Sequence, residues 1–217
     1  MKNFNTERFW NNKIKHERSL LETDPMTIDR IRTAYKFLPL KKEMKILDIG
    51  AGYGFIEELL SRNENIEIYG NDISGAAIDD LRERFKGNFK KESIYNMNYK
   101  NEYFDVIFAL EILEHIPKNK IIILLKKIRK IIKRNGSLII SIPINEGLNL
   151  RKGNPNAHLR EYTEEVIQKE LAEAGFKILK IERLVAFNSF YHFKNLIRKV
   201  FKNKWKPNNL VILSKPI

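Results

Sequence analysis

The chain has 217 residues, enough for one domain with a full core, and 40 Lys and Arg against 27 Asp and Glu give a formal net charge of +13. It has no cysteine, which excludes a disulfide framework, a thiolate nucleophile and a cysteine-based zinc site. No apolar run approaches membrane-spanning length and the N-terminus lacks the apolar stretch of a signal peptide, so we expect no integral membrane segment and a cytoplasmic protein.

The positive charge is unevenly distributed along the chain. No Asp or Glu follows Glu182, and this last segment carries +8 of the total +13, leaving +5 for residues 1–182. The positive charge is compatible with an RNA partner. Alternatively, it reflects only a composition that is generally rich in Lys, Ile and Asn. Both interpretations stay open.

Two helices are predicted in the first forty residues. Phe9 and Trp10 begin an apolar patch, and Asp24-Pro25 ends it. Apolar residues then recur at helical spacing over residues 28–38, before Pro39 ends the run.

A glycine-rich turn follows the first predicted strand, Lys45–Ile49. Gly50, Gly52 and Gly54 alternate with other residues, and an amphipathic helix begins at Phe55. Glycine allows positive φ angles and lets a ligand lie against the backbone, while the helix start offers free N–H groups. Strand, glycine turn and helix form the opening unit of a nucleotide-binding α/β sheet.

The charge beside this turn indicates which nucleotide would bind. The spacing is G-x-G-x-G, not the G-x-G-x-x-G of dinucleotide sites, and Asp48 stands two residues before the first glycine. A carboxylate there would repel a pyrophosphate and attract a ligand that carries an ammonium and a sulfonium. A nicotinamide oxidoreductase is therefore the disfavoured rival.

The run Asp48-x-Gly50-x-Gly52-x-Gly54 resembles the first motif of the class I S-adenosylmethionine-dependent methyltransferases. With the motifs below, the resemblance covers roughly residues 40–184. It implies S-adenosyl-L-methionine as cofactor and an α/β fold, a doubly wound and mostly parallel seven-stranded sheet with a final antiparallel strand. Extra N-terminal helices in such enzymes commonly cap the substrate side; simple packing against the sheet is the alternative.

The second predicted strand, Ile66–Asp72, ends on an acid. Asp72 lies 24 residues after Asp48, close to the interval at which an acid meets ribose hydroxyls in such folds. A carboxylate accepts two hydrogen bonds from a cis-diol. Ser74 already suits the cap of the next helix, Gly75–Phe85, so we assign Asp72 to the ribose.

The third strand, Asn88–Ile94, is short and polar. Glu92-Ser93 stands where the family usually shows an acid and a small residue near the adenine, although the family more often has Asp. An ordinary surface Glu is the alternative interpretation.

The fourth strand, Tyr103–Leu110, leads into the string Glu111-Ile112-Leu113-Glu114-His115. An FDV strand followed by an E-x-L-E-H loop is similar to the family pattern. Ligands bind outside the carboxyl ends of parallel strands, so we expect this loop to border the transferred methyl group. A helix over 119–134, ended by Asn135-Gly136, and a fifth strand over 137–143 follow.

The C-terminal third is predicted as a polar loop (147–155), a helix that Thr163 caps and Gly175 ends, and strands over 176–184 and 209–214. The string from His158 to Thr163 also resembles small-molecule and sugar-modifying methyltransferases. Residues 187–206 predict a basic amphipathic helix. Its roles stay open: packing on the sheet, a lid, an anionic-substrate patch or a membrane-surface contact.

His115 is the predicted catalytic residue, because a base matters when the acceptor is a hydroxyl and imidazole titrates near neutral pH. A histidine that only shapes the pocket is the alternative. The resemblance and the spacing place these residues against the cofactor: Asp48, Gly50, Ala51, Gly52, Gly54, Asp72, Ile73, Glu92, Ser93, Leu110 and Glu111.

We predict a site without a metal ion, with one alternative. Glu111, Glu114, His115 and the distant His158 are oxygen and imidazole ligands that could hold a divalent metal. This set is similar to that of small-RNA 2′-O-methyltransferases, in which a metal activates ribose hydroxyls. The E-x-L-E-H string also occurs in methyltransferases without a metal.

Three parts of the chain are predicted: an N-terminal helical cap (1–40), a cofactor-binding core (41–184), and a basic helix with the final strand (185–217). The predicted function is S-adenosylmethionine-dependent O-methylation of a small-molecule, saccharide or lipid-linked acceptor. The alternatives are a metal-assisted RNA ribose 2′-O-methyltransferase and a non-catalytic RNA- or membrane-binding protein on the same scaffold.

Overall fold

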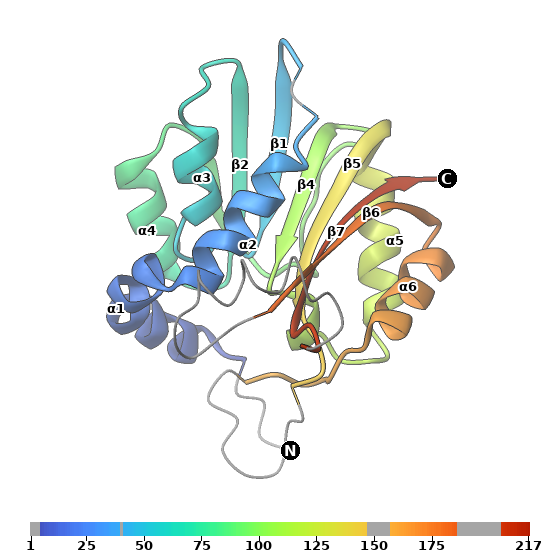
Figure 1. The fold of residues 1–217 in the computed structure, drawn as a ribbon. Coiled ribbons are helices and arrows are strands. Elements are labelled where there is room, and N and C mark those ends of the chain that lie inside the picture. The colour runs from blue at the N-terminus through green and yellow to red at the C-terminus, as the bar shows by residue number, and fades with distance from the viewer. Residues whose placement is uncertain (1–4, 40, 147–156, 186–204) are drawn as a thin grey trace.

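A seven-stranded sheet with helices on both faces forms the molecule (Figure 1). The structure is a computed structural model and describes residues 5–39, 41–146, 157–185 and 205–217. The strands are β1 (Met44–Ile49), β2 (Ile66–Asp72), β3 (Asn88–Lys91), β4 (Phe104–Leu110), β5 (Ile132–Pro143), β6 (Phe176–Leu184) and β7 (Asn209–Pro216). The helices are α1 (Glu7–Thr23), α2 (Pro25–Lys36), α3 (Phe55–Leu60), α4 (Gly75–Arg84), the 3-10 turn η1 (Leu113–His115), α5 (Ile121–Ile131) and α6 (Glu164–Glu173).

The strand order is β3-β2-β1-β4-β5-β7-β6, and it confirms the predicted doubly wound sheet. β1 pairs in parallel with both β2 and β4, while β7 runs antiparallel to β5 and β6. The chain winds outward from β1 to β3, then returns to place β4 on the other side of β1. This reversal opens a crevice at the carboxyl ends of β1 and β4, where ligands bind in such sheets.

Alternating side chains of the strands build one hydrophobic cluster on each face. Leu47 of β1 faces the cluster that contains Leu125 of α5, whereas its neighbour Ile46 faces the cluster of α3 and α4. α2 packs against α3 and against strands β5, β6 and β7, and α1 packs against α4. The sheet is therefore covered on both sides, and the ends of its strands remain for a ligand.

The two predicted helix caps are confirmed by their hydrogen bonds. The side chains of Ser74 and Thr163 accept from the backbone N–H three residues ahead, at the starts of α4 and α6. Asp24, predicted only as the end of the first apolar patch, caps α2 in the same way. Gly175 follows α6 in the left-handed conformation, with φ of +82°.

The boundary between α5 and β5 differs from the prediction of a helix over 119–134 with Gly136 as its stop. The helix ends at Ile131 and β5 begins at Ile132, which is buried and pairs with Phe104 of β4. The last carbonyl groups of the helix accept from the loop before β4: Glu102 N–H bonds the oxygen of residue 130, and Tyr103 N–H bonds that of Ile131. Pairing with β4 thus takes over before the Asn-Gly pair is reached.

Two predicted segments lie almost wholly outside the described residues: the polar loop over 147–155 and the basic helix over 187–206. Within the described part of the chain, no helix has both the length and the apolar character needed to cross a membrane.

Candidate functional site

A cavity of about 1050 Å³ lies at the carboxyl ends of the central strands. Its walls come from the turn after β1, the end of β2, the loop after β4, helices α1 and α2, and residues 158–159 before α6. Segments far apart in the sequence therefore meet over the predicted glycine turn. The N-terminal helices both pack on the fold and border the cavity.

The glycine turn brings backbone close to the loop after β4. Gly50 has φ of +71°, and a Cβ atom there would lie 2.1 Å from Cδ1 of Ile112. The N–H groups of Gly50 and Ala51 donate to the carbonyl oxygen of Asn71 at 2.8 and 3.0 Å, which ties the turn to β2. A side chain at Gly50 has neither the backbone conformation nor the space.

Asp72 joins the turn to the start of α4. One carboxylate oxygen accepts from the N–H of Gly52 at 3.0 Å, and the other accepts from the N–H of Ser74 at 2.7 Å. Burial raises the pKa of Asp72, and these backbone N–H groups oppose the rise because they stabilise the charged form. The side chain lines the cavity with Ile73 beside it.

Asp48 has a partner that the sequence did not predict. Glu57, in the first turn of α3, is fully buried beside it, and burial raises the pKa of Glu57 to about 7. Burial, followed by the charge of Glu57, also raises the pKa of Asp48 well above its usual range. The two carboxyl groups therefore carry less than two negative charges at neutral pH. Glu57 was missed because an acid in a first helical turn is an ordinary helix-dipole pattern.

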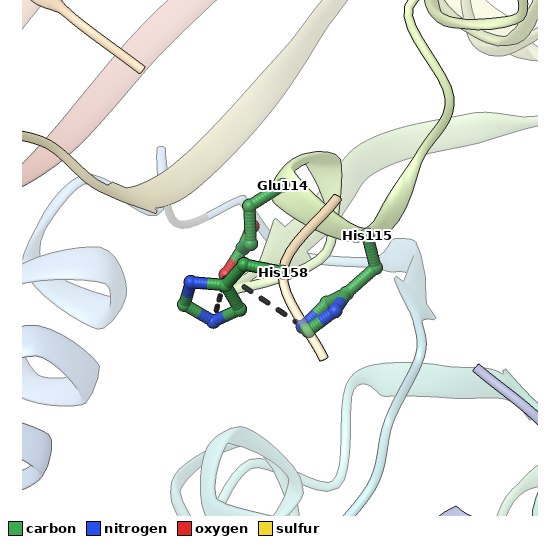
Figure 2. A group of neighbouring side chains, drawn as sticks. All are labelled: Glu114, His115 and His158. Atoms are coloured by element: carbon green, nitrogen blue, oxygen red, sulfur yellow. Dashed lines mark ion pairs between the residues drawn. The ribbon is translucent and has the colours of Figure 1, made fainter. Parts of the chain in front are cut away.

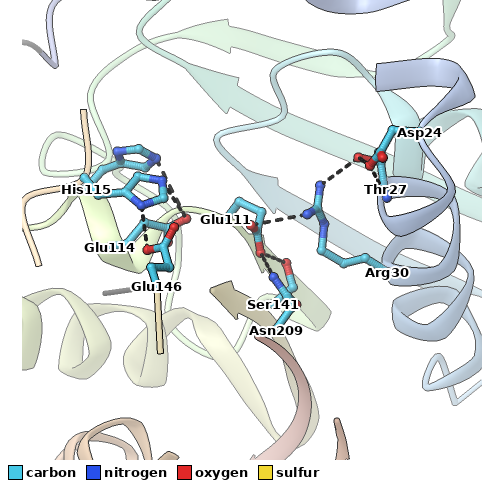
Figure 3. A network of polar contacts seen from close by, with 10 residues as sticks. Asp24, Thr27, Arg30, Glu111, Glu114, His115, Ser141, Glu146 and Asn209 are labelled. Carbon is cyan, nitrogen blue, oxygen red and sulfur yellow. Dashed lines mark hydrogen bonds and ion pairs between the residues drawn. The ribbon is translucent and has the colours of Figure 1, made fainter. Parts of the chain in front are cut away.

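Glu111 is held by three elements, as Figure 3 shows. Its Oε1 accepts from the Ser141 hydroxyl at 2.8 Å and from the Asn209 amide at 3.0 Å, and its Oε2 lies 3.3 Å from Nη1 of Arg30. The residue has a positive φ of 56°, an uncommon conformation for a side chain of this size. The Arg30 contact, which ties α2 to the loop after β4, has no signature in the sequence.

Glu114, His115 and His158 form a compact cluster on one wall of the cavity (Figure 2). Nε2 of each histidine lies 3.9 Å from Oε1 of Glu114. The Leu159 N–H donates to the backbone oxygen of Glu114 at 2.9 Å and pins residues 157–159 beside η1. His158, 43 positions beyond His115, is thereby brought to the E-x-L-E-H loop.

The His115 side chain is 11% exposed and packs edge-on against Trp10 of α1, with ring centroids 5.0 Å apart. Burial lowers the pKa of His115 to about 3, with a further lowering from the nearby His158. The ring is therefore neutral at pH 7 and can accept a hydrogen bond, but its proton affinity is low for a general base.

Most predicted site residues meet at this cavity. Those that line it are Asp48, Gly50, Ala51, Gly52, Asp72, Ile73, Ser93, Leu110, Glu111 and His115. Gly54 and Glu92 lie outside the lining: Gly54 is the left-handed N-cap of α3, and Glu92 is half-buried after β3. The contributions of Arg30, Trp10 and Glu146 were not predicted.

Comparison with known proteins gives a consistent family. A family model described as a methyltransferase domain matches residues 26–181. The ribosomal protein L11 methyltransferase of Dictyoglomus turgidum is 27% identical over 163 residues, which cover 73% of this chain and 46% of that protein. The phosphoethanolamine N-methyltransferase of Plasmodium falciparum is 23% identical over 175 residues, covering 77% and 60%. The chain thus spans less than two thirds of the length of either relative.

Solved structures share the fold at low sequence identity. A Haloferax volcanii methyltransferase, determined in complex with the Trm112 methyltransferase activator, superposes with a TM-score of 0.76 at 12% identity, covering 95% of this chain and 97% of that one. Further structures of the same fold are described as S-adenosylmethionine-dependent methyltransferases.

Proposed function

The chain belongs to the class I S-adenosylmethionine-dependent methyltransferases, and from this membership we propose that it transfers a methyl group to an oxygen atom of a small-molecule, saccharide or lipid-linked acceptor. The bound cofactor supplies an electrophilic methyl group on a sulfonium. The chain's own residues hold the two reactants in line and exclude water. The division into a cap (1–40), a core (41–184) and a C-terminal part (185–217) is retained as part of this proposal.

The turn after β1 would hold the cofactor. Its left-handed Gly50 leaves backbone exposed to the cavity, and Asp72 presents a carboxylate at the end of β2, where a ribose diol would meet it. Asp48 borders the same space as part of a buried acid pair, and the negative charge that this pair retains would favour a cationic ligand over a pyrophosphate. The backbone near Ser93 and Leu110 would line the adenine and methionine ends.

One observation supports the proposed acceptor class. The glycine turn and His115 line the same cavity, which α1 and α2 border. A volume of about 1050 Å³ lies just above the usual range of about 300–1,000 Å³ for ligand pockets. Such a cavity has room for a cofactor and a small acceptor together. Its far wall presents imidazole and carboxylate groups, which accept hydrogen bonds from a hydroxyl. We assign His115 to the part of this wall that lies nearest to that hydroxyl.

The test is methyl transfer from tritium-labelled cofactor into a cell extract that is fractionated into RNA, protein, lipid, saccharide and small molecules. We expect label in the small-molecule, saccharide or lipid fraction. The Asp72→Ala variant serves as the control, because loss of the ribose contact removes the label without altering the acceptor wall. Label confined to protein, or to nitrogen or carbon atoms of any product, would refute the proposal.

An RNA ribose hydroxyl is the second candidate. The observation that favours it is the approach of His158 to Glu114, since that grouping was the condition for the predicted RNA-type site. If RNA is labelled, it is digested to nucleosides and the labelled nucleoside is identified. Label that is absent from 2′-O-methylated nucleosides would exclude this candidate.

A further inference from the structure

We propose that Glu114, His115 and His158 bind one divalent transition-metal ion at the wall of the cavity. One ligand atom from each residue lies within 4.8 Å of the other two. The three side chains come from η1 and from the segment before α6, and Figure 2 shows both rings directed at the same carboxylate. Binding of the ion by these three side chains does not depend on which acceptor is methylated.

The spacing suits a single ion. Metal bonds to imidazole nitrogen and carboxylate oxygen are about 2.1 Å long, so two ligands at a tetrahedral angle lie about 3.4 Å apart. Both Glu114–histidine separations are 3.9 Å, and all three ligand atoms lie within 4.8 Å of one another. Binding of one ion would therefore require each separation to shorten, and the Glu114–histidine separations would each shorten by about half an ångström.

Both rings are oriented by their other nitrogen atom. Nδ1 of His158 lies 2.9 Å from a carboxylate oxygen of Glu146, and Nδ1 of His115 lies 3.3 Å from the carbonyl oxygen of Ala157. The Asn5 amide donates to that same carbonyl group at 3.0 Å and holds it in place. When Nδ1–H donates to these acceptors, the lone pair is on Nε2, the atom that faces Glu114. Carboxylates and carbonyl groups behind histidine ligands are characteristic of metal sites.

Glu114 supplies an independent indication. Its side chain is 1% exposed, and neither carboxylate oxygen has a hydrogen-bond partner among the described residues. A buried carboxylate without a partner is costly, and a bound cation removes that cost. The packing of Trp10 against His115 adds an apolar shell of the kind that surrounds metal centres.

The ligand set excludes Glu111, which the sequence had grouped with the other three. Its oxygen atoms already contact Ser141, Asn209 and Arg30. The first acid of the E-x-L-E-H string is thus occupied by the contact with α2, and only the second acid faces the histidines.

Two imidazoles and one carboxylate suit Zn²⁺, Mn²⁺, Fe²⁺ or Co²⁺ better than Ca²⁺ or Mg²⁺. Three protein ligands leave coordination positions open, as in catalytic metal sites. Resting on the proposed function, an acceptor hydroxyl in an open position would be fixed beside the cofactor and would lose its proton more readily.

The experiment is calorimetry of the chelator-treated, dialysed full chain with Mn²⁺ and with Zn²⁺, each metal alone. We expect one ion per chain and at least 100-fold weaker binding in Glu114→Gln, His115→Gln and His158→Gln. The matched control is His16→Gln, which removes an exposed histidine of α1 and should leave affinity unchanged. Glu146→Gln removes a positioning residue and should weaken binding about 10- to 100-fold, with the stoichiometry retained.

Two further readouts keep the outcomes separate. Binding of S-adenosylhomocysteine to each variant shows that the cofactor end is folded, and Co²⁺ added to the wild type should give visible absorption bands from a nitrogen- and oxygen-ligated ion. Metal affinity unchanged in both histidine variants, or no ion bound below about 1 mM, overturns the metal site. Failure to bind S-adenosylhomocysteine while the ion still binds overturns the proposed function instead.

Discussion

Replacing Glu57 by Gln tests the buried acid pair behind the glycine turn. Glu57 is fully buried, and both of its carboxylate oxygens are without a hydrogen-bond partner among the described residues. Gln keeps the shape of the side chain and removes its titration. We expect the variant to lose a specific part of the pH dependence of stability.

The magnitude follows from the pKa of Glu57, which burial raises from 4.5 to about 7. A raised pKa means that the folded state binds the proton more tightly than the unfolded chain. This favours folding fully below pH 4.5, and the contribution disappears as pH rises through about 7. Each tenfold change in proton affinity is worth about 1.4 kcal/mol, so the unfolding free energy should fall by about 3 kcal/mol across this range.

The assay is urea denaturation at pH 5 and pH 8, without cofactor, for wild type and Glu57→Gln. The difference in unfolding free energy between the two proteins should move by about 2.5 kcal/mol in favour of the variant on going to pH 8, because the unfolded carboxyl group is already largely ionised at pH 5. Glu58→Gln, an exposed acid one position along α3, is the control and should follow the wild type. Parallel pH profiles for wild type and Glu57→Gln would refute the assignment of a protonated acid pair.

Three further substitutions test the glycine turn, the buried ion pair beside α6 and the N-cap of α6. Gly50→Ala should weaken S-adenosylhomocysteine binding at least tenfold, because a Cβ at φ +71° meets Ile112 at 2.1 Å; calorimetry measures this. Arg160→Met removes the charged partner of the buried Glu170 carboxylate, leaving it the hydrogen bond from the Tyr162 hydroxyl, and should lower the unfolding free energy by about 3 kcal/mol in denaturant. Thr163→Ala removes the N-cap of α6 and should cost about 1 kcal/mol, measured as a lower denaturation midpoint.

Each of these has a control or a refuting outcome. Gly75→Ala adds a Cβ with no atom nearer than 3.6 Å, so it should bind S-adenosylhomocysteine as the wild type does. Equal losses in the two glycine variants would contradict the clash at Gly50. Replacing both Arg160 and Glu170 by apolar residues should lower the unfolding free energy by less than Arg160→Met does. A larger loss of unfolding free energy in the double variant would show that the two residues do not form a desolvated ion pair. A Thr163→Ala protein with unchanged stability would mean that α6 is held by packing alone.

Local signals in the sequence were sufficient for the order of the elements. β2 was predicted at its observed bounds, Ile66–Asp72, because alternation and the terminal acid are properties of consecutive residues. The caps Ser74 and Thr163 were predicted for the same reason, since the capping oxygen and its donor are three residues apart. The error at 132–136 arose where pairing with Phe104, a distant partner, overrode the Asn-Gly signal.

What the sequence alone determined is the glycine turn, the acid at the end of β2 and the family, since each depends on closely spaced residues. Only the tertiary structure decided which acids are paired and which face one another. Glu57 reaches Asp48 across the turn, Arg30 removes Glu111 from the ligand set, and residues 157–159 bring His158 to Glu114. These contacts depend on chain segments that are separated in sequence and packed against the same strand ends, and no residue pattern encodes a distance of that kind.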